Sequence, residues 1–377
     1  MRVCILTNNT RTDNGWGRFA REFITALRTC GVEVVICSEE GGGYPDEHVV
    51  LTNSLRFSLH SFFKTLLHLP VLLRNALRVR EHLGGCNLIH ALDGYPYGVI
   101  GALASFGSKL PLMVTLQGTY SLDAFYHAVE RKFLTWALCH ARKVVCISSY
   151  MAREIKKYIA GISSQVIGHG TTSLWLSAPT DPRPPSIPKP YLLSVGTVKP
   201  QKGYRISLAA YARAREKFPD LSYVIVGFQG HEHFSKIQDE ARVLGISSHV
   251  HFLTGLSDAE LLRLYDHAEL FVLTPVSMGT NIEGFGLVYR EAGARGLAVI
   301  GSRDCGADDA VKDGVTGILC PQNDVDMVTR ALEKLLADEK FRKDMGENGK
   351  KLAKRETWVL AARRYSAAYE AVVRRSQ

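Results

Sequence analysis

The sequence predicts an α/β protein built from two Rossmann-like domains that face a cleft. Short apolar, β-branched runs alternate with amphipathic segments along the chain, a pattern typical of parallel sheets covered by helices on both faces. The alternation stops at 177–190, a stretch with six prolines, and then starts again. Because proline-rich segments are stiff and extended, we interpret this stretch as a linker between two domains.

The first domain is expected to begin with a strand at 2–8 and a helix at 18–30. In that helix Phe19, Phe23 and Leu27 recur every four residues on one face. Further strands are expected where apolar residues follow one another without interruption, at 32–38, 87–91, 112–116 and 143–148. Such continuous runs indicate parallel strands that are buried on both faces.

The second domain repeats this pattern. Strands are expected at 191–195, 222–227, 250–253, 270–273 and 298–301. Helices are expected to begin at 203, to cover 234–244 and 289–295, and to fill the chain from about 325 onward. Ser257 and Glu260 have the spacing of a capping box at a helix start. We therefore expect a first domain over 1–177, a linker over 178–190 and a second domain over 191–357.

The composition of the chain limits which binding partners and which cell compartment we expect. The net charge of +9 suits acidic partners, but no nucleic-acid-binding motif is evident, so no nucleic acid is expected. The eight cysteines form no CxxC pair, which argues against a zinc site or a disulfide framework and favours a reducing cytosol. The apolar run at the N-terminus is too short for a signal peptide, and no run approaches the ~18 residues of a transmembrane helix. We expect a cytoplasmic protein.

Glu283 and Glu291 bracket the run Gly284-Phe285-Gly286, between an expected strand and an expected helix. Glycine lets the backbone approach a ligand closely, and the first amides of a helix have no partner within it, so this turn predicts an anion site suited to a diphosphate. The two carboxylates can accept hydrogen bonds from sugar or ribose hydroxyls. The alternative, which the spacing alone would favour, is a glycine-capped loop with two surface glutamates.

With these motifs the chain resembles the retaining glycosyltransferases of the GT-B fold and is similar to glycosyltransferase family 4. The resemblance covers nearly the whole chain and is strongest at 256–275, 283–296 and 306–324. It implies transfer of a hexose-type sugar from a nucleotide-diphosphate sugar to a glycan, glycolipid or small-molecule acceptor, in cell-surface polysaccharide or glycoconjugate biosynthesis. No Asp-x-Asp metal motif is evident in a suitable place, so we expect no required metal, and no cofactor is expected. The resemblance also implies that the segment 358–377 crosses back to the first, acceptor-binding domain, while the second domain binds the nucleotide sugar.

The resemblance implies a role for each residue of the glycine turn. Glu283 would contact the donor sugar beside the reacting carbon, and Glu291 would hold the nucleotide ribose. The diphosphate would be bound by four backbone amides, those of Gly284, Phe285, Gly286 and Leu287. With Lys202, Glu283 would form the catalytic pair.

A second group of candidate binding residues, Gly196, Thr197 and Lys202, follows the expected strand at 191–195. A cation here would offset the charge of the departing diphosphate. The family usually has an arginine at the position of Thr197 and a lysine at that of Lys202. The arginine is therefore missing, and whether Lys199 replaces it stays open.

In the first domain, candidate ligand-binding residues follow the first, third and fourth expected strands. Gly15 and Gly17 form a glycine turn that in the family contacts donor phosphate and acceptor. Gln117 stands where the family commonly has a histidine; glutamine can bond to a sugar hydroxyl but does not titrate near neutral pH. Contacts with the donor sugar or the acceptor are expected from four side chains of this domain, Trp16, Asp93, Tyr95 and Gln117.

The stretch 54–83 is rich in leucine, phenylalanine and arginine, and Pro70 is expected to divide it into two amphipathic pieces. A basic amphipathic face can lie on an anionic membrane surface, so peripheral membrane contact is one interpretation. The other is a pair of helices that pack on the sheet with their arginines in water.

Two rival functions stay open. A nicotinamide-dependent dehydrogenase would also have Rossmann halves, but the turn at 15–17 lacks the third glycine of the dinucleotide-binding motif. A non-catalytic protein that binds a nucleotide sugar, derived from a transferase, is supported by the departures at Thr197 and Gln117.

Overall fold

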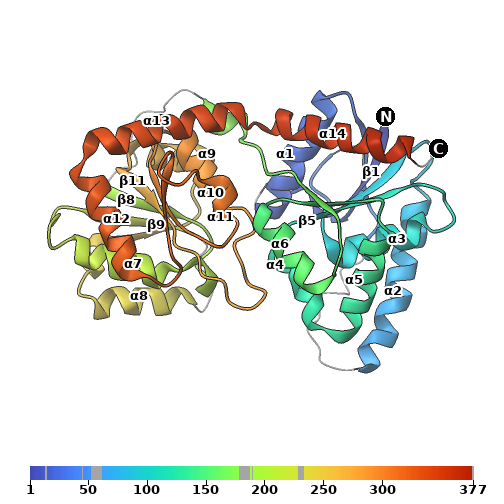
Figure 1. The fold of residues 1–377 in the computed structure, drawn as a ribbon, viewed down its shortest axis with the longest axis horizontal. Coiled ribbons are helices and arrows are strands. Elements are labelled where there is room, and N and C mark those ends of the chain that lie inside the picture. Colours follow the sequence, from blue (N-terminus) through green and yellow to red (C-terminus); the bar gives the residue numbers. More distant parts are fainter. Residues whose placement is uncertain are drawn as a thin grey trace. The chain divides into compact units, whose positions relative to one another are not determined.

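The computed structural model describes residues 1–12, 15–44, 46–51, 62–177, 187–188, 190–227 and 233–375, and their side chains outside 62–67. The chain divides into two compact units (Figure 1), one made of Met1–Gly168 with Trp358–Gln377 and the other of His169–Thr357. The proline-rich stretch expected to be a linker lies largely outside the described residues.

Within its described residues the first unit holds a seven-stranded sheet in the order β3-β2-β1-β4-β5-β6-β7, with parallel pairing throughout. The core of β1 is completely buried from Val3 to Leu6, as its unbroken apolar run predicts. The strands are β1 (Arg2–Asn9), β2 (Glu33–Glu40), β3 (Glu47–Val49), β4 (Leu88–Ala91), β5 (Leu112–Leu116), β6 (Lys143–Cys146) and β7 (Ser164–Val166).

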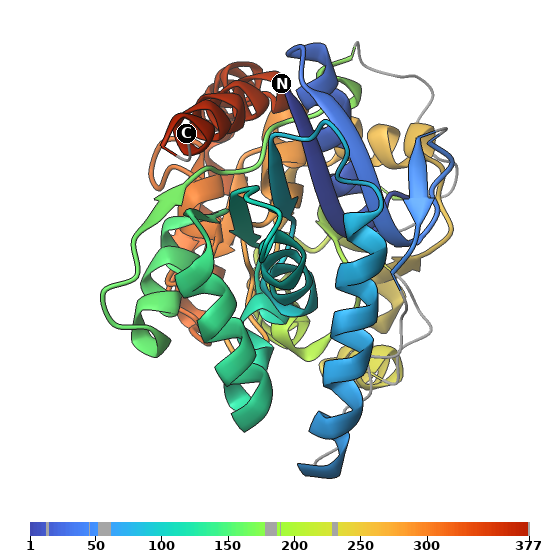
Figure 2. The same cartoon turned by 90° about the vertical axis from the view of Figure 1, so that its right-hand side faces the viewer.

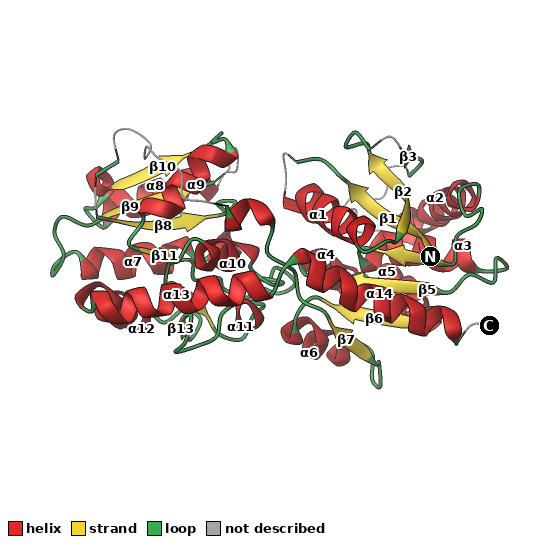
Figure 3. Cartoon of the chain, turned by 90° about the horizontal axis from the view of Figure 1, so that it is seen from above, coloured by secondary structure: helices red, strands yellow, loops and turns green. Residues whose placement is uncertain are grey.

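Helices cover both faces of this sheet (Figure 3). They are α1 (Gly15–Thr29), α2 (Phe62–Arg80), α3 (Val99–Ser105), α4 (Thr119–Asp123), α5 (Ala128–His140), α6 (Ser149–Tyr158) and α14 (Trp358–Arg374), with short helical turns at Gly94–Gly98 and Ala124–Tyr126. The prediction that Pro70 divides 54–83 into two pieces is wrong, because α2 continues through it. The fixed φ of proline is itself helical, so a single missing backbone bond is tolerated here.

The last helix, α14, belongs to the first unit and packs on α1 (Figures 1 and 2). Tyr365 of α14 lies edge-on to Phe23 of α1, with ring centroids 4.7 Å apart. The hydroxyl of Tyr369 lies 2.7 Å from Nδ1 of His90 in β4. Burial lowers the pKa of His90 to about 3, so this imidazole is neutral in the fold. The predicted return of the C-terminal segment to the first domain is therefore confirmed.

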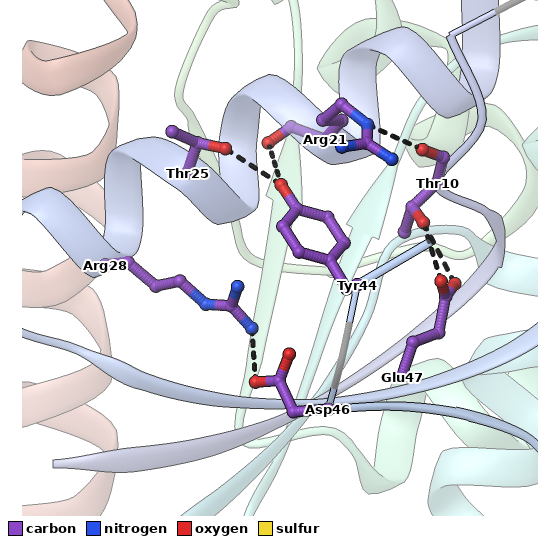
Figure 4. Close-up of polar contacts among 7 residues, drawn as sticks. All are labelled: Thr10, Arg21, Thr25, Arg28, Tyr44, Asp46 and Glu47. Atoms are coloured by element: carbon purple, nitrogen blue, oxygen red, sulfur yellow. Dashed lines mark hydrogen bonds and ion pairs between the residues drawn. The ribbon is translucent and has the colours of Figure 1, made fainter. Parts of the chain in front are cut away.

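The segment after β2 is fastened to α1 (Figure 4). The ring of Tyr44 lies under the guanidinium groups of Arg21 and Arg28, 4.6 and 4.7 Å from its centroid. The Tyr44 hydroxyl also donates to the carbonyl of Arg21 at 3.2 Å. At the end of β1 the hydroxyl of Thr10 lies 3.0 Å from both carboxylate oxygens of Glu47 in β3. These contacts fix the loop at the carboxyl edge of the sheet.

Within its described residues the second unit holds a six-stranded sheet in the order β10-β9-β8-β11-β12-β13, again with parallel pairing throughout. Its strands are β8 (Tyr191–Val195), β9 (Ser222–Val226), β10 (Val250–Leu253), β11 (Leu270–Val272), β12 (Val299–Ser302) and β13 (Gly317–Cys320). Its helices are α7 (Tyr204–Ala214), α8 (His233–Val243), α9 (Asp258–His267), α10 (Leu287–Ala294), α11 (Ala307–Ala310), α12 (Val325–Ala337) and α13 (Glu339–Arg355).

The predicted capping box is confirmed at the start of α9. The hydroxyl of Ser257 accepts from the amide of Glu260 at 3.3 Å, and the carboxylate of Glu260 accepts from the amide of Ser257 at 2.8 Å. Both units are therefore doubly wound α/β folds, as the sequence predicts.

Candidate functional site

The candidate site of the second unit lies at the point where its strand order reverses. β8 and β11 are neighbours, and the chain moves from β8 toward β9 and from β11 toward β12, which lie on opposite sides. The loops that leave these two strands therefore diverge and open a crevice, which is where ligands bind in such sheets. Lys202 follows β8 and Glu283 follows β11.

The structure brings Lys202 and Glu283 together. The Nζ of Lys202 lies 2.6 Å from Oε2 of Glu283, and their side chains are 23% and 10% exposed. The backbone of Glu283 is also held, because its carbonyl accepts from the amide of Gly306 at 2.8 Å. A cation and an acceptor of hydroxyl protons thus stand side by side, partly shielded from water.

Gly203 explains how the two loops come so close. Its φ is +67°, and a Cβ there would lie 1.7 Å from the carbonyl oxygen of Thr274. The hydroxyl of Thr274 donates to the carbonyl of Gly203 at 3.0 Å, and the amide of Val276 donates to the carbonyl of Gln201 at 2.9 Å. No larger residue fits at this position, so the glycine is what sets Lys202 against the loop after β11.

The glycine turn leads directly into α10. Gly286 is the residue before the helix, with a φ of +82°, and a Cβ there would lie 2.5 Å from the ring of Tyr289. A Cβ on Gly306 would lie 2.2 Å from the backbone of Gly284, so two chain segments touch at this point. The first amides of α10, beginning with Leu287, lie at the N-terminal end of the helix, where an anion is stabilised.

Phe285 faces the interior and is only 3% exposed. Its ring lies 5.2 Å from the ring of His169 and 5.7 Å from the guanidinium of Arg290. Burial lowers the pKa of His169 to about 3, so the contact is one of a neutral imidazole with an aromatic ring. His169 therefore packs against the glycine turn, and Phe285 anchors the turn through its side chain.

Glu291 lies one turn into α10, where the buried hydroxyl of Tyr265 donates to its Oε2 at 3.2 Å. Burial, and then the Glu291 carboxylate, hold the pKa of Tyr265 well above its usual range, so the phenol keeps its proton and remains a donor. Gly196 is fixed in the same way, since its carbonyl accepts from the hydroxyl of Tyr204 at 2.8 Å. Thr197 follows it in the same loop and is partly exposed.

The first unit also reverses its strand order, between β1 and β4. At the end of β1 the indole of Trp16 donates to the hydroxyl of Thr7 at 3.1 Å. A Cβ on Gly17 would lie 2.1 Å from Oδ1 of Asn9, so the close packing of α1 on this loop requires glycine, whereas Gly15 has open space around it. In the glycine turn of the first unit, Gly17 is therefore required for the packing of α1 against the end of β1.

Asp93 follows β4 and is 2% exposed. Its Oδ1 accepts from the backbone amide of Gly94 at 2.7 Å and from the hydroxyl of Ser121, which in turn accepts from the backbone amide of Gln117 at 2.8 Å. Burial raises the pKa of Asp93 to about 7, against the opposing effect of these donors. Ser121 therefore links the carboxylate of Asp93 to the backbone of Gln117. Tyr95 instead contacts α2, with its hydroxyl 3.4 Å from Nδ1 of His68.

Glu39 is a polar residue of this edge that the sequence reasoning missed. Its carboxylate accepts from Nδ2 of Asn8 at 3.0 Å and from the hydroxyl of Tyr97 at 2.7 Å. The sequence does place Glu39 at the end of an apolar strand. Because the carboxyl ends of parallel strands lie at one edge of a sheet, this position could have marked Glu39 as a candidate.

Among the described residues, no group of three or more His, Cys, Asp or Glu side chains is arranged to hold a metal ion. Within the same residues, each helix is too short or too polar to cross a membrane.

Two protein-family models match adjoining parts of the chain. The model described as Glycosyltransferase Family 4 matches residues 13–172, and the one described as Glycosyl transferases group 1 matches residues 180–352. Together they cover most of both units and leave out β1 and α14.

Curated relatives point the same way. A GDP-mannose-dependent alpha-(1-6)-phosphatidylinositol monomannoside mannosyltransferase of Mycolicibacterium smegmatis is 34% identical over 164 residues, which are 43% of this chain and only 42% of the relative. A D-inositol 3-phosphate glycosyltransferase of Corynebacterium diphtheriae is 34% identical over 46% of this chain and 41% of the relative. An uncharacterized glycosyltransferase of Methanocaldococcus jannaschii is 27% identical over 78% of this chain and 79% of its own length.

Solved structures share the fold. The Anabaena protein HepE, in complex with UDP and glucose, superposes with a TM-score of 0.77 at 19% identity, covering 98% of this chain and 100% of that one. A sucrose-phosphate synthase of Thermosynechococcus elongatus superposes with a TM-score of 0.74 at 18% identity, covering 99% of each chain.

Proposed function

This chain is a GT-B protein similar to glycosyltransferase family 4, and on that premise we propose that it is a retaining glycosyltransferase with a nucleotide-diphosphate sugar as donor. The sugar is of the hexose type, and the acceptor is a glycan, a glycolipid or a small molecule that offers a hydroxyl group. The rest of the proposal concerns which residues carry this reaction.

The pairing of Lys202 with Glu283 is the observation that carries the proposal. Their side chains touch at 2.6 Å beside the glycine turn that opens α10. A diphosphate bound at this turn meets the first amides of the helix on one side and Lys202 on the other. The carboxylate of Glu283 then accepts hydrogen bonds from hydroxyls of the donor sugar, and Glu291, which already accepts from Tyr265, accepts from the ribose.

The reaction we propose balances without a further reactant. The bond between C1 of the sugar and the diphosphate oxygen breaks, and a bond between C1 and the acceptor oxygen forms. The acceptor proton passes to the departing phosphate oxygen, on the face from which the diphosphate leaves, so the anomeric configuration is retained. Lys202 and the amides of α10 stabilise the charge that grows on the leaving group. With these positive groups in place, we propose that neither a metal nor a cofactor takes part.

The donor and acceptor classes draw support from the relatives. One relative is named for GDP-mannose, another for inositol 3-phosphate, and a protein of the same fold was solved with UDP-glucose. We place the acceptor in the first unit, where Asp93, Gln117 and Glu39 gather at the carboxyl edge, and the protein in cell-surface polysaccharide or glycoconjugate biosynthesis in the cytoplasm.

A thermal-shift panel of uridine, guanosine, adenosine and thymidine diphosphates and their sugars tests the donor site. Selective stabilisation by one base is expected, because a ligand that binds the fold raises its unfolding temperature. Turnover is then measured as release of that nucleotide in the presence of acceptor, with and without EDTA. No response to any nucleotide would contradict the donor site, and loss of turnover with EDTA would contradict metal independence.

The second candidate is a non-catalytic protein that binds the nucleotide sugar. The threonine at position 197, in place of the family's arginine, favours it because one cation on the leaving group is missing. Stabilisation by a nucleotide sugar, combined with no nucleotide release for any acceptor tried, would support this candidate over the transferase.

A further inference from the structure

One face of α2 exposes leucine side chains in a row. Leu69, Leu73 and Leu77 are 38%, 44% and 59% exposed, and their spacing of four residues places them on one side of the helix. The opposite side packs on the unit, and among its described side chains Leu72, Asn75, Ala76 and Val79 are buried. Isolated exposed leucines are ordinary, but a row along one helix face marks a surface that suits an apolar partner.

Phe106 adds a fourth apolar side chain near the end of this row. It is 67% exposed and follows α3. The guanidinium of Arg80, the last residue of α2, donates to the carbonyls of Leu103 and Ala104 at 3.0 and 3.1 Å, and also to that of Phe106. The loop after α3 is thereby tied to the C-terminal end of α2. Leu69, Leu73, Leu77 and Phe106 form what we call the apolar stripe.

The charge of α2 itself is one-sided, and the exposed Glu81 follows directly after the helix. From His48 to Arg80 the sequence contains no aspartate or glutamate, while it contains five basic residues, Arg56, Lys64, Arg74, Arg78 and Arg80. Arg74 is exposed and adjoins Leu73, and Lys109 is exposed in the loop that carries Phe106. Apolar side chains among cations, with no carboxylate on the helix, complement an anionic lipid surface, in which headgroup phosphates meet the cations and acyl chains meet the leucines.

We propose that the apolar stripe binds the surface of an anionic lipid bilayer, with α2 lying in the plane of the interface. α2 runs along the outside of the first unit (Figure 2), and its His68 contacts Tyr95, which follows β4. Leu73 and Leu77 enter the interface, and Arg74 stays at the level of the phosphates. This contact is independent of the proposed transferase activity, because it uses none of the residues of either switch point.

Flotation with vesicles tests the apolar part of the contact. The full chain is mixed with vesicles of phosphatidylcholine alone or of equal parts phosphatidylglycerol and phosphatidylcholine. The wild type is expected to float with the anionic vesicles, and Leu73→Ser with Leu77→Ser is expected to lower the partition coefficient about tenfold or more. The matched control is Val243→Ser with Val315→Ser, which changes two apolar side chains of the second unit that are 86% and 51% exposed. This control should float like the wild type.

Charge is tested in the same assay. Arg74→Gln is expected to lower partition onto anionic vesicles about fivefold, because a cation at an anionic surface contributes on the order of 1 kcal/mol. Arg330→Gln, an exposed arginine of the second unit, is the control and should have no effect. All variants should keep the wild-type unfolding midpoint and nucleotide-induced thermal shift.

Four outcomes overturn the proposal. In the first, the wild type does not float with anionic vesicles. In the second, it floats equally with phosphatidylcholine alone and does so regardless of Arg74. In the third, the double leucine variant floats like the wild type. In the fourth, the double leucine variant changes the mass of the lipid-free protein, which would make the apolar stripe a contact between two copies of the chain.

Discussion

The carboxyl edges of the two sheets are built alike and charged differently. In each, the strand order reverses between two neighbouring strands, and polar side chains follow both of them. In the second unit a lysine stands at the edge, paired with Glu283 beside the glycine turn. In the first unit the acidic side chains accept from neutral donors, Glu39 from an amide and a phenol, Asp93 from an amide and a hydroxyl.

This difference indicates what each edge can bind. An edge with a cation and a helix start stabilises a diphosphate. An edge whose acids are already satisfied by neutral hydrogen bonds offers acceptors and donors to hydroxyl groups and disfavours added negative charge. We therefore propose that the edge of the second unit binds the diphosphate and that the edge of the first unit binds the hydroxylated acceptor.

The largest expected effect comes from breaking the Lys202–Glu283 pair. We expect Glu283→Ala and Lys202→Ala each to lower turnover about 10²–10³-fold, because each removes an interaction that is stronger in the transition state than in the ground state. The measurement is nucleotide release from the donor that the thermal-shift panel identifies.

The chain contains a matched control for this pair. Lys217 and Glu333 are also 2.6 Å apart, but their side chains are 63% and 26% exposed, against 23% and 10% for Lys202 and Glu283. Lys217→Ala and Glu333→Ala should leave turnover within about twofold, since exposed pairs contribute little. Unchanged turnover in Glu283→Ala would show that this carboxylate has no catalytic role. The difference in charge between the two edges would then not explain turnover.

A smaller effect is expected at the edge of the first unit, from Asp93→Asn. Burial raises the pKa of Asp93 from 3.8 to about 7, so the folded protein binds a proton that the unfolded chain has released. Stability is therefore lost as the pH rises from about 4 through about 7. Asparagine can accept the same two hydrogen bonds and does not titrate. We expect the variant to gain about 1–3 kcal/mol relative to the wild type between pH 5 and pH 8.

Chemical denaturation of both proteins at the two pH values measures this gain. A difference in unfolding free energy that is independent of pH would mean that Asp93 is ionised in the fold. The edge of the first unit would then carry a buried negative charge, and the contrast with the second unit would become sharper.

The smallest expected effect is at Glu291. Tyr265→Phe removes a hydroxyl that donates to this carboxylate at 3.2 Å. We expect nucleotide diphosphate to bind about threefold to tenfold more weakly by calorimetry, because one hydrogen bond contributes about 1 kcal/mol. Tyr211→Phe, which removes a buried hydroxyl bonded to the carbonyl of Leu221 at 2.7 Å, is the control and should leave the affinity unchanged.

The fold could be predicted from the sequence because its strands are continuous apolar runs and its helix starts are marked, as at Ser257 and Glu260. The three-residue strands β3 and β7 escaped prediction, because their polar residues and short length give no periodicity to detect. Pro70 misled the prediction, since the rule that proline ends a helix has exceptions that depend on tertiary contacts.

Within the candidate site, the spacing of Glu283, Glu291 and Lys202 was visible in the sequence, whereas their partners were not. Tyr265 and His169 contact the site from positions far away in the chain, which only the packed structure reveals. Glu39 shows the same limit, because its partners Asn8 and Tyr97 come from two other elements.

Because α14 packs on the first unit, the order in which the two units can fold during synthesis differs from their order in the sequence. Residues 169–357 form the second unit without a break, whereas the first unit needs both 1–168 and the segment that starts at Trp358. During synthesis the second unit can therefore complete its core while the first still lacks the aromatic side chains that cover Phe23 and His90. The first unit therefore cannot complete its core before α14 has been made, and until then Phe23 of α1 lacks its aromatic partners Trp358 and Tyr365.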